Sequence, residues 1–340
     1  MRVSMEVELQ AALGAASAAA RLCRAVQEEM VQGDYLSKKD RSPVTVADFG
    51  SQAVVCKLLR EAFPHDQILA EETAAMLMER ENRDLLQRVA SFISRIFPEA
   101  QPESVCRWID LGGKSGSGRH WCLDPIDGTK GFLRHDQYAI ALALILEERV
   151  VLGVLACPNL WLEPGLITDS RGVLFYAVEG NGAFQMSLEG TGALPIRVSH
   201  SVLGDPCLRF CESFESGHSD HEGQARLAKA LGITAPSIRM DSQAKYGLVA
   251  RGEADIYLRL PNPKTPHYKE KVWDHAAGSI IIEEAGGRVS DIHGEPLRFG
   301  SGDKLVANEG VVATNGLVHQ RVLEALAQMA GTLPSSSGLR

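Results

Sequence analysis

The stretch that most restricts the fold is WCLDPIDGTKGF, residues 121–132. Its apolar start predicts a buried strand, and Asp124 and Asp127 follow on either side of a proline ring that fixes φ near about −65°. Gly128 lets a backbone N–H approach a ligand closely, and a helix beginning there would direct more N–H groups to the same point, which suits a phosphate. Carboxylates and a phosphate repel unless a hard cation lies between them, and oxygen ligands favour Mg²⁺. The alternative is a type I turn in which both aspartates are caps.

Other acids lie at the edges of predicted elements. Glu71 and Glu72 directly follow a short apolar segment, Asp48 lies in the first turn of a helix predicted over 44–63, and Asp274 precedes another helix. Each has an ordinary alternative: a solvated loop for the glutamates, pairing with the helix dipole for Asp48, and an N-cap for Asp274. Together with the central turn they form a set of acidic points beside apolar structure.

The pattern of elements changes near residue 200. Two apolar alternating segments before it predict hairpins at 139–158 and 173–187, the second with a Gly-Asn-Gly turn. Later segments alternate helix and strand. Helices are predicted over 6–31, 44–63, 83–97, 221–232 and 319–330, and short strands over 67–70, 120–124, 208–213 and 311–315. A Gly/Ser-rich loop is predicted over 111–119.

Composition excludes several classes of partner. The 340 residues carry a formal net charge of −8, so a nucleic-acid polymer is not an expected partner. No apolar run reaches the ~18 residues that span a bilayer. The Ala-rich segment after Glu6 and Glu8 predicts a first helix rather than a signal or transit peptide. We expect a cytoplasmic monomer; a weak dimer and an organellar location, if an upstream transit peptide is missing, are the alternatives.

Two further patterns indicate no metal or nucleotide motif of their own. The seven cysteines include no CxxC pair, which argues against zinc and for a reducing compartment. A disulfide between Cys207 and Cys211 is an open alternative. Gly113 precedes Lys-Ser as in a P-loop, but the glycine required five positions earlier is Trp108.

Three segments carry a resemblance to a known family. They are WCLDPIDGTKGFLR (121–134), MDSQAKYGLVARGEADIYLRLP (240–261) and EKVWDHAAGSIIIEEAGG (270–287). The DPIDGT and WDHAAG motifs resemble the lithium-sensitive, Mg²⁺-dependent phosphomonoesterases of the inositol monophosphatase and fructose-1,6-bisphosphatase superfamily. Lys130 with the residues after it, and the SQAKY segment, resemble the plant and fungal 3'(2'),5'-bisphosphate nucleotidases within it.

The resemblance implies a fold and a reaction. The fold is an α-β-α-β-α sandwich of five layers, with an N-terminal α+β half (1–195) and a C-terminal α/β half (196–330). Composition alone predicts that the tail (331–340) is disordered. The reaction removes the 3'-phosphate of adenosine 3',5'-bisphosphate to give AMP and phosphate. The sulfated nucleotide and inositol 1,4-bisphosphate are further implied substrates, and inhibition by Li⁺ is implied as well.

The resemblance also implies roles for individual residues. Asp48 and Thr129 match the pair that activates the attacking water. Two to three Mg²⁺ ions would be held by Glu71, Asp124, the carbonyl of Ile126, Asp127 and Asp274. Substrate binding is implied for Thr129, His218, Ser242, Lys245, Arg259 and Asp274. Ala70 departs from the family, in which glycine usually precedes the acid pair.

Two other functions remain open at this stage. An inositol monophosphatase would share the metal carboxylates but lack the nucleotide-binding segments. A non-catalytic nucleotide sensor could use the same scaffold. Lys245 and Arg259 also have an ordinary alternative as surface charges, and His218 as a structural histidine.

Overall fold

The structure is a computed structural model and describes residues 5–32, 42–113, 117–163, 171–214, 221–262, 265, 267–300 and 302–331. The first strands form a large sheet with the order β2-β1-β3-β4-β5-β6-β7-β8. They are β1 (Gln67–Ala70), β2 (Gly112–Gly113), β3 (Arg119–Asp127), β4 (Ala139–Leu146), β5 (Arg149–Trp161), β6 (Arg171–Val178), β7 (Ala183–Ser187) and β8 (Leu194–Ile196). Only β1 runs parallel to its neighbours β2 and β3; the other pairs are antiparallel.

The remaining strands form a smaller sheet with the order β10-β9-β11-β13-β12. They are β9 (Phe210–Glu212), β10 (Ile238–Arg239), β11 (Ile256–Arg259), β12 (Arg288–Ser290) and β13 (Val311–Thr314). β13 is antiparallel to both neighbours, whereas β9 is parallel to β10 and β11. The helix-strand alternation predicted after residue 200 is therefore confirmed.

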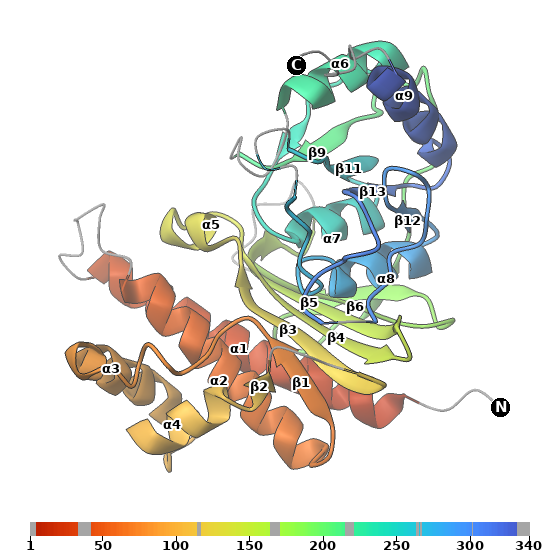
Figure 1. Cartoon of the computed structure of the whole chain (residues 1–340). Coiled ribbons are helices and arrows are strands. Elements are labelled where there is room, and N and C mark those ends of the chain that lie inside the picture. The colour runs from red at the N-terminus through yellow and green to blue at the C-terminus, as the bar shows by residue number, and fades with distance from the viewer. Residues whose placement is uncertain are drawn as a thin grey trace, which may run out of the picture.

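Helices separate and cover the two sheets, giving five layers (Figure 1). The helices are α1 (Glu6–Gln32), α2 (Ser42–Ala62), η1 (Arg80–Asn82), α3 (Arg83–Ser94), α4 (Pro102–Ile109), α5 (Thr129–Leu133), α6 (His221–Leu231), α7 (Ala244–Ala250), α8 (Ala276–Glu284) and α9 (His319–Gly331). α1 and α2 cover the outer face of the large sheet, α7 and α8 lie between the sheets, and α6 and α9 cover the small sheet. The five-layered sandwich is confirmed. The division into halves at residues 195 and 196 stays a prediction.

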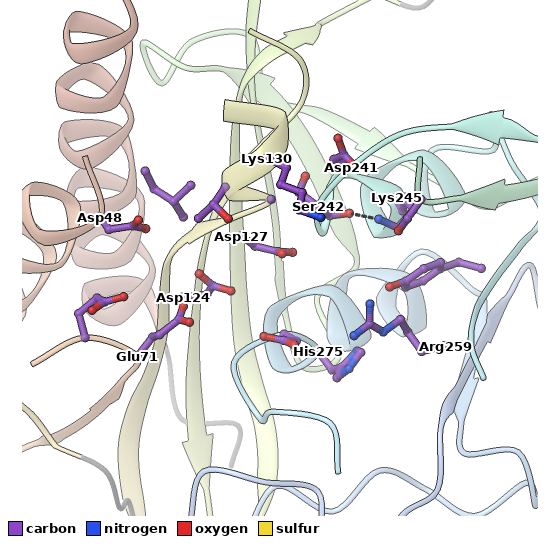
Figure 2. Close-up of a pocket in the computed structure, with 17 residues that line it drawn as sticks. Asp48, Glu71, Asp124, Asp127, Lys130, Asp241, Ser242, Lys245, Arg259 and His275 are labelled. Atoms are coloured by element: carbon purple, nitrogen blue, oxygen red, sulfur yellow. Dashed lines mark hydrogen bonds between the residues drawn. The ribbon is translucent and has the colours of Figure 1, made fainter. Parts of the chain in front are cut away.

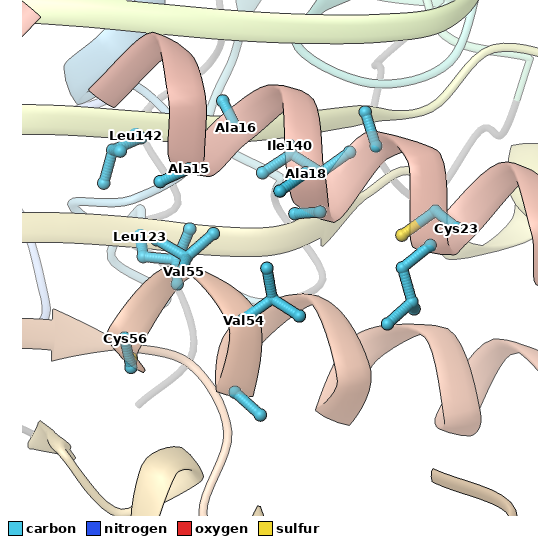
Figure 3. Packing of buried hydrophobic residues seen from close by; sticks show 14 of the residues in the cluster. Ala15, Ala16, Ala18, Cys23, Val54, Val55, Cys56, Leu123, Ile140 and Leu142 are labelled. Carbon is cyan, nitrogen blue, oxygen red and sulfur yellow. The ribbon is translucent and has the colours of Figure 1, made fainter. Parts of the chain in front are cut away.

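Strand β4 shows how the sequence divides the core. Its residues alternate between faces, so Ile140 and Leu142 join the cluster under α1 and α2, while Ala141 and Ala143 join the cluster facing α8. Figure 3 shows part of the first cluster, in which alanines of α1 lie beside Ile140 and Leu142, and valines of α2 lie on the other side of these strand side chains. Small residues let α1 approach the sheet closely, which explains the Ala-rich sequence.

Several predictions of local structure are corrected. The Gly/Ser-rich segment at 111–119 contributes the short edge strand β2, although 114–116 lie outside the described residues. Helix α3 ends at Ser94 rather than at residue 97. Helix α4 was not predicted; its signals are Pro102 in the first turn and the reciprocal capping bonds of Gln101 with Ser104. The tail from residue 332 lies outside the described part of the chain.

Both predicted hairpins, the first helix and the last helix are confirmed. Among the described residues, no helix combines the length and apolar character needed to cross a membrane. All seven cysteines are free, so the disulfide between Cys207 and Cys211 is not formed.

The contact between β5 and α8 depends on Gly153. A Cβ at this position would lie 2.6 Å from the Ala277 carbonyl oxygen and 2.6 Å from Ile280 Cγ2. We therefore expect Gly153→Ala to lower the free energy of unfolding by about 1–3 kcal/mol, because the helix must shift. Chemical denaturation checks this. Gly14→Ala is the matched control: no heavy atom lies within 4 Å of its added Cβ, so it should stabilise α1 by about 0.5–1 kcal/mol. Equal effects would contradict the packing argument.

Candidate active site

A cavity of about 240 Å³ lies between the carboxyl end of β3 and the segments around α7 and α8. It is lined by every predicted site residue that the structure describes: Asp48, Glu71, Asp124, Ile126, Asp127, Thr129, Ser242, Lys245, Arg259 and Asp274. Figure 2 shows the acids of the N-terminal segments facing the cations of the C-terminal segments. His218 lies outside the described residues.

Strand pairing brings Glu71 and Asp124 together. β1 and β3 are parallel neighbours, and Ala70 pairs with Leu123, so the next residue of each strand emerges at the same edge of the sheet. Asp48 reaches this edge from α2, where it lies in the second turn rather than the predicted first turn. The side chain of Asp48 is only 9% exposed. Pairing with the helix dipole therefore does not account for its position.

The acidic segment is the irregular end of β3 (Arg119–Asp127), not a turn that follows a strand ending at Asp124, and two other elements hold it in place. Its register is irregular between Asp124 and Asp127, and the Pro125 carbonyl accepts a 2.8 Å hydrogen bond from the Ser51 hydroxyl of α2. Asp127 accepts a 2.6 Å hydrogen bond from the backbone N–H of Gln243, and the N-cap of α5 is Gly128 with no side-chain cap. The alternative in which Asp127 caps the following helix is therefore wrong.

Gly128 is required at this point for two reasons. Its φ is +87°, and an added Cβ would lie 2.8 Å from Ser242 Cβ. The turn of the N-terminal half thus packs directly against the segment that begins α7. Ser242 itself has a φ of +69°, which is uncommon for a residue other than glycine and holds the next N–H toward Asp127.

Asp274 is also not the helix cap that its sequence position allowed. The N-cap of α8 is His275, and no side chain caps that helix. Burial and the nearby charge of Asp127 raise the pKa of Asp274, although Arg259 opposes this. The carboxyl of Asp274 therefore interacts with the charges of the other lining acids, and we call Asp48, Glu71, Asp124, Asp127 and Asp274 the acid cluster.

The acid cluster carries more negative charge than its protein surroundings balance. Burial first, and then neighbouring carboxylates, raise the pKa of Asp48 and of Asp124 well above their usual range. Asp124 Oδ1 is buried and has no hydrogen-bond partner in the described part of the chain. A buried carboxylate oxygen without a partner is costly. A hard divalent cation fits this arrangement, because it would satisfy that oxygen and neutralise its neighbours.

The opposite wall supplies fixed cations. Lys245 is only 3% exposed, and its Nζ donates to the carbonyls of Ser242 at 2.8 Å and Met240 at 3.2 Å. Burial lowers the pKa of Lys245, although the nearby charge of Asp127 opposes this. Arg259, at the end of β11, forms an ion pair with Glu270 at 3.0 Å. Both cations line the cavity and are not ordinary surface charges.

One group near this wall has the composition of a metal site. Glu270, Asp274 and His275 each place a ligand atom within 4.8 Å of the others. Two of the three are already paired with each other, because Glu270 Oε2 contacts His275 Nε2 at 3.1 Å. Burial alone would raise the pKa of Glu270, but His275 and Arg259 together lower it to about 2. Glu270 is therefore a partner of Arg259 and His275.

Sequence reasoning missed several lining residues. They are Glu72, Lys130, Ser213, Asp241, Tyr257 and His275. Most of them are neighbours of assigned residues, such as Glu72 beside Glu71 and Tyr257 two residues before Arg259. Alternation along β11 puts positions 257 and 259 on one face, which is the signal that could have found Tyr257.

The sandwich and its acid-lined cavity define a class of phosphatase, and comparison with known proteins agrees. The chain belongs to the inositol monophosphatase family, whose family model matches residues 4–330. Members of this family generally depend on Mg²⁺.

Curated relatives are similar over nearly the whole chain. A 3'(2'),5'-bisphosphate nucleotidase from Oryza sativa is 44% identical over 337 residues, covering 94% of this chain and 93% of the relative. One from Schizosaccharomyces pombe is 42% identical over 352 residues, covering 98% of each chain. Among solved structures, an inositol monophosphatase from Zymomonas mobilis superposes with a TM-score of 0.62 at 21% identity, covering 96% of this chain and all of that one. This last likeness supports the fold alone.

The raised carboxyl pKa values predict how stability depends on pH without metal. Since the pKa values of Asp48, Asp124 and Asp274 are higher in the folded protein, these groups favour folding at low pH. That contribution is lost as pH rises through the folded-state values. We expect the Tm of metal-free protein to fall as pH rises above about 4, the ordinary pKa of an aspartate, and saturating Mg²⁺ to reverse most of the fall.

Asp124→Asn should flatten the same pH dependence, because the amide carries no charge. Differential scanning fluorimetry with and without EDTA measures both effects. Asp66→Asn, remote from the cavity, should retain the wild-type response to Mg²⁺. A Tm that does not respond to Mg²⁺ at any pH would contradict a metal site here.

Proposed function

We propose that this chain is a 3'(2'),5'-bisphosphate nucleotidase that removes the 3'-phosphate of adenosine 3',5'-bisphosphate to give AMP and phosphate. The observation that carries the proposal is a single cavity with two unlike walls. One wall is a cluster of carboxylates suited to a metal-bound phosphate, and the other presents Lys245 and Arg259, suited to a second phosphate. The names of the relatives support the same assignment. The sulfated nucleotide and inositol 1,4-bisphosphate are proposed as further substrates.

The metal ligands we propose are Glu71, Asp124, the Ile126 carbonyl, Asp127 and Asp274, which together would hold two to three Mg²⁺ ions. Bound Mg²⁺ would neutralise the scissile phosphate and lower the pKa of a coordinated water. The protein holds its ligands in place before binding. Asp127 is fixed by the Gln243 N–H, and the turn is fixed by Ser51 through the Pro125 carbonyl.

Asp48 and Thr129 are the proposed residues for water activation. Both line the cavity, Asp48 from α2 and Thr129 from the first position of α5. Burial and the charges of Glu72 and Glu71 raise the pKa of Asp48, which makes its carboxylate a better proton acceptor. Thr129 can donate its proton to that carboxylate while its oxygen accepts from the water, which orients the attack.

The substrate's second phosphate is assigned to the C-terminal wall. Arg259 presents a planar fork of donors that matches phosphate oxygens, and Lys245 adds a compact charge. Ser242 borders the same region, and Asp274 would contact the ribose side of the substrate. His218 remains a proposed substrate contact from the sequence alone. A monomer and a cytoplasmic location likewise stay predictions.

Two alternatives are less well supported. An inositol monophosphatase does not need Lys245 and Arg259 beside the acids, and the Zymomonas mobilis inositol monophosphatase described above is only 21% identical to this chain. A non-catalytic nucleotide sensor has no need for a complete acid cluster. Asp48, whose charge is costly to bury, argues for catalysis.

Turnover of different substrates tests the proposal. With Mg²⁺, kcat/KM for adenosine 3',5'-bisphosphate should exceed that for inositol 1-phosphate, because only the first has a second phosphate for Lys245 and Arg259. Asp127→Asn should lower kcat by at least about 100-fold, since it removes a proposed metal ligand. Phosphate release measures both. Faster turnover of inositol 1-phosphate, or an active Asp127→Asn variant, would contradict the assignment.

Inhibition by Li⁺ is a separate prediction. Li⁺ is a hard cation that can compete for one of the proposed Mg²⁺ positions without supplying the same charge. Millimolar LiCl should therefore slow release of phosphate at fixed Mg²⁺, and NaCl at equal ionic strength should not. An unchanged rate in LiCl would rule out this expectation while leaving the substrate assignment in place.

A further inference from the structure

A chain of hydrogen bonds leads from the interior of the central helical layer to Arg259. The Tyr246 hydroxyl contacts His275 Nδ1 at 2.8 Å, His275 Nε2 contacts Glu270 Oε2 at 3.1 Å, and the same oxygen accepts from Arg259 Nη2 at 3.0 Å. Arg259 Nε also donates to this oxygen at 3.3 Å. Three segments of the protein, namely α7, the 270–275 segment and β11, are therefore linked to one guanidinium that lines the cavity.

This series of hydrogen bonds is buried, and one assignment of its protons gives every donor an acceptor. Tyr246 is fully buried, His275 is 1% exposed, and the side chain of Glu270 is 12% exposed. If the tyrosine donates to Nδ1, the ring proton lies on Nε2 and is donated to Glu270, which also accepts from Arg259. Every donor then has an acceptor, as buried polar groups require.

The packing around Tyr246 fixes the end of the hydrogen-bond series that lies opposite Arg259. A Cβ at Gly278 would lie 2.3 Å from the Tyr246 ring, so α7 and α8 are in direct contact at this point. The Tyr246 ring also packs edge-on against Tyr257 at 5.0 Å between centroids. Since the tyrosine cannot move without disturbing both helices, the hydroxyl is a rigid anchor.

We propose that Glu270, held by His275 and Tyr246, is a positioning residue that fixes the Arg259 guanidinium for the second phosphate of the substrate. The inference rests on the proposed function, because it concerns the same cavity. Anchoring through both Nε and Nη2 sets the plane of the guanidinium before the substrate arrives, which reduces the ordering cost of binding. The device therefore favours bisphosphates over monophosphates with the same scissile group.

The test compares two substrates that differ only in that second phosphate: adenosine 3',5'-bisphosphate and adenosine 3'-monophosphate. We expect Glu270→Gln to lower the ratio of their kcat/KM values by about tenfold, the order expected for loss of a charged hydrogen bond. Tyr246→Phe, which keeps the ring packing, should lower the ratio in the same direction by a smaller factor. Asp66→Asn is the matched control, since Asp66 is similarly buried and pairs with Arg119 at 2.9 Å, remote from the cavity; it should leave the ratio unchanged.

A double-mutant comparison separates positioning from general structural damage. If Glu270 acts through Arg259, adding Glu270→Gln to Arg259→Met should produce no further fall in the ratio. An equal fall in both backgrounds, or an unchanged ratio in the single variant, would overturn the proposal. Thermal melts of all variants identify any loss of folding, and Tyr246→Phe decides the question if Glu270→Gln does not fold.

Binding of AMP, which keeps the 5'-phosphate and needs no turnover, distinguishes this inference from the proposed function. Calorimetry should give a Kd for AMP about tenfold weaker in Glu270→Gln than in wild type. If wild type binds AMP more tightly than Glu270→Gln does, but does not hydrolyse the bisphosphate, the proposed function alone is contradicted. A wild type that hydrolyses it while the variant keeps full AMP affinity would contradict the inference alone. A wild type that neither binds AMP nor hydrolyses the bisphosphate would contradict both the proposed function and the inference.

Discussion

The rest of the site depends on the mutual repulsion of carboxylates that the fold holds together. Parallel pairing of β1 with β3 forces Glu71 beside Asp124, and α2 adds Asp48 from the other side. Apart from cations, little can balance such a group, and Asp124 Oδ1 has no hydrogen-bond partner among the described residues. The folded chain therefore has an electrostatic cost that a divalent ion would relieve, so the proposed metal affinity would follow from strand order as much as from ligand chemistry.

The second wall is tied to the first through the backbone. Gly128 packs against Ser242, and the left-handed conformation of Ser242 directs the Gln243 N–H to Asp127. The same short segment continues into α7, which carries Lys245 and Tyr246. A shift of α7 would therefore move a proposed metal ligand and a proposed phosphate contact together. The two proposed phosphate sites would therefore be kept at a fixed spacing by one turn and one helix, without a flexible linker between them.

Sequence reasoning reached the acid turn because its chemistry is local. Asp124 and Asp127 are three residues apart around a proline, and the hairpins follow from alternation over short windows. Asp48 and Glu71 had ordinary local explanations and were assigned by resemblance, since only the tertiary fold shows them facing Asp124. From the sequence, Lys245 could equally have been a surface charge. In the structure it is buried and donates to two backbone carbonyls. Glu270 had no local signal at all: its role depends on pairing with Arg259, eleven residues earlier on another element.

The position of Arg259 explains why its anchor must be an acid. Arg259 is close enough to Asp274 to lower the pKa of that carboxyl, so an unrestrained guanidinium would be drawn toward the proposed metal ligands. There it would compete with a cation for Asp274. Glu270 offers a negative partner at 3.0 Å and would hold the guanidinium on its own side of the cavity. A neutral acceptor could orient the fork but would not offset this attraction, because the interaction of two unit charges at such short range in a low-dielectric site exceeds that of a neutral hydrogen bond. The anchor thereby keeps the proposed phosphate-binding cation and the acid cluster apart.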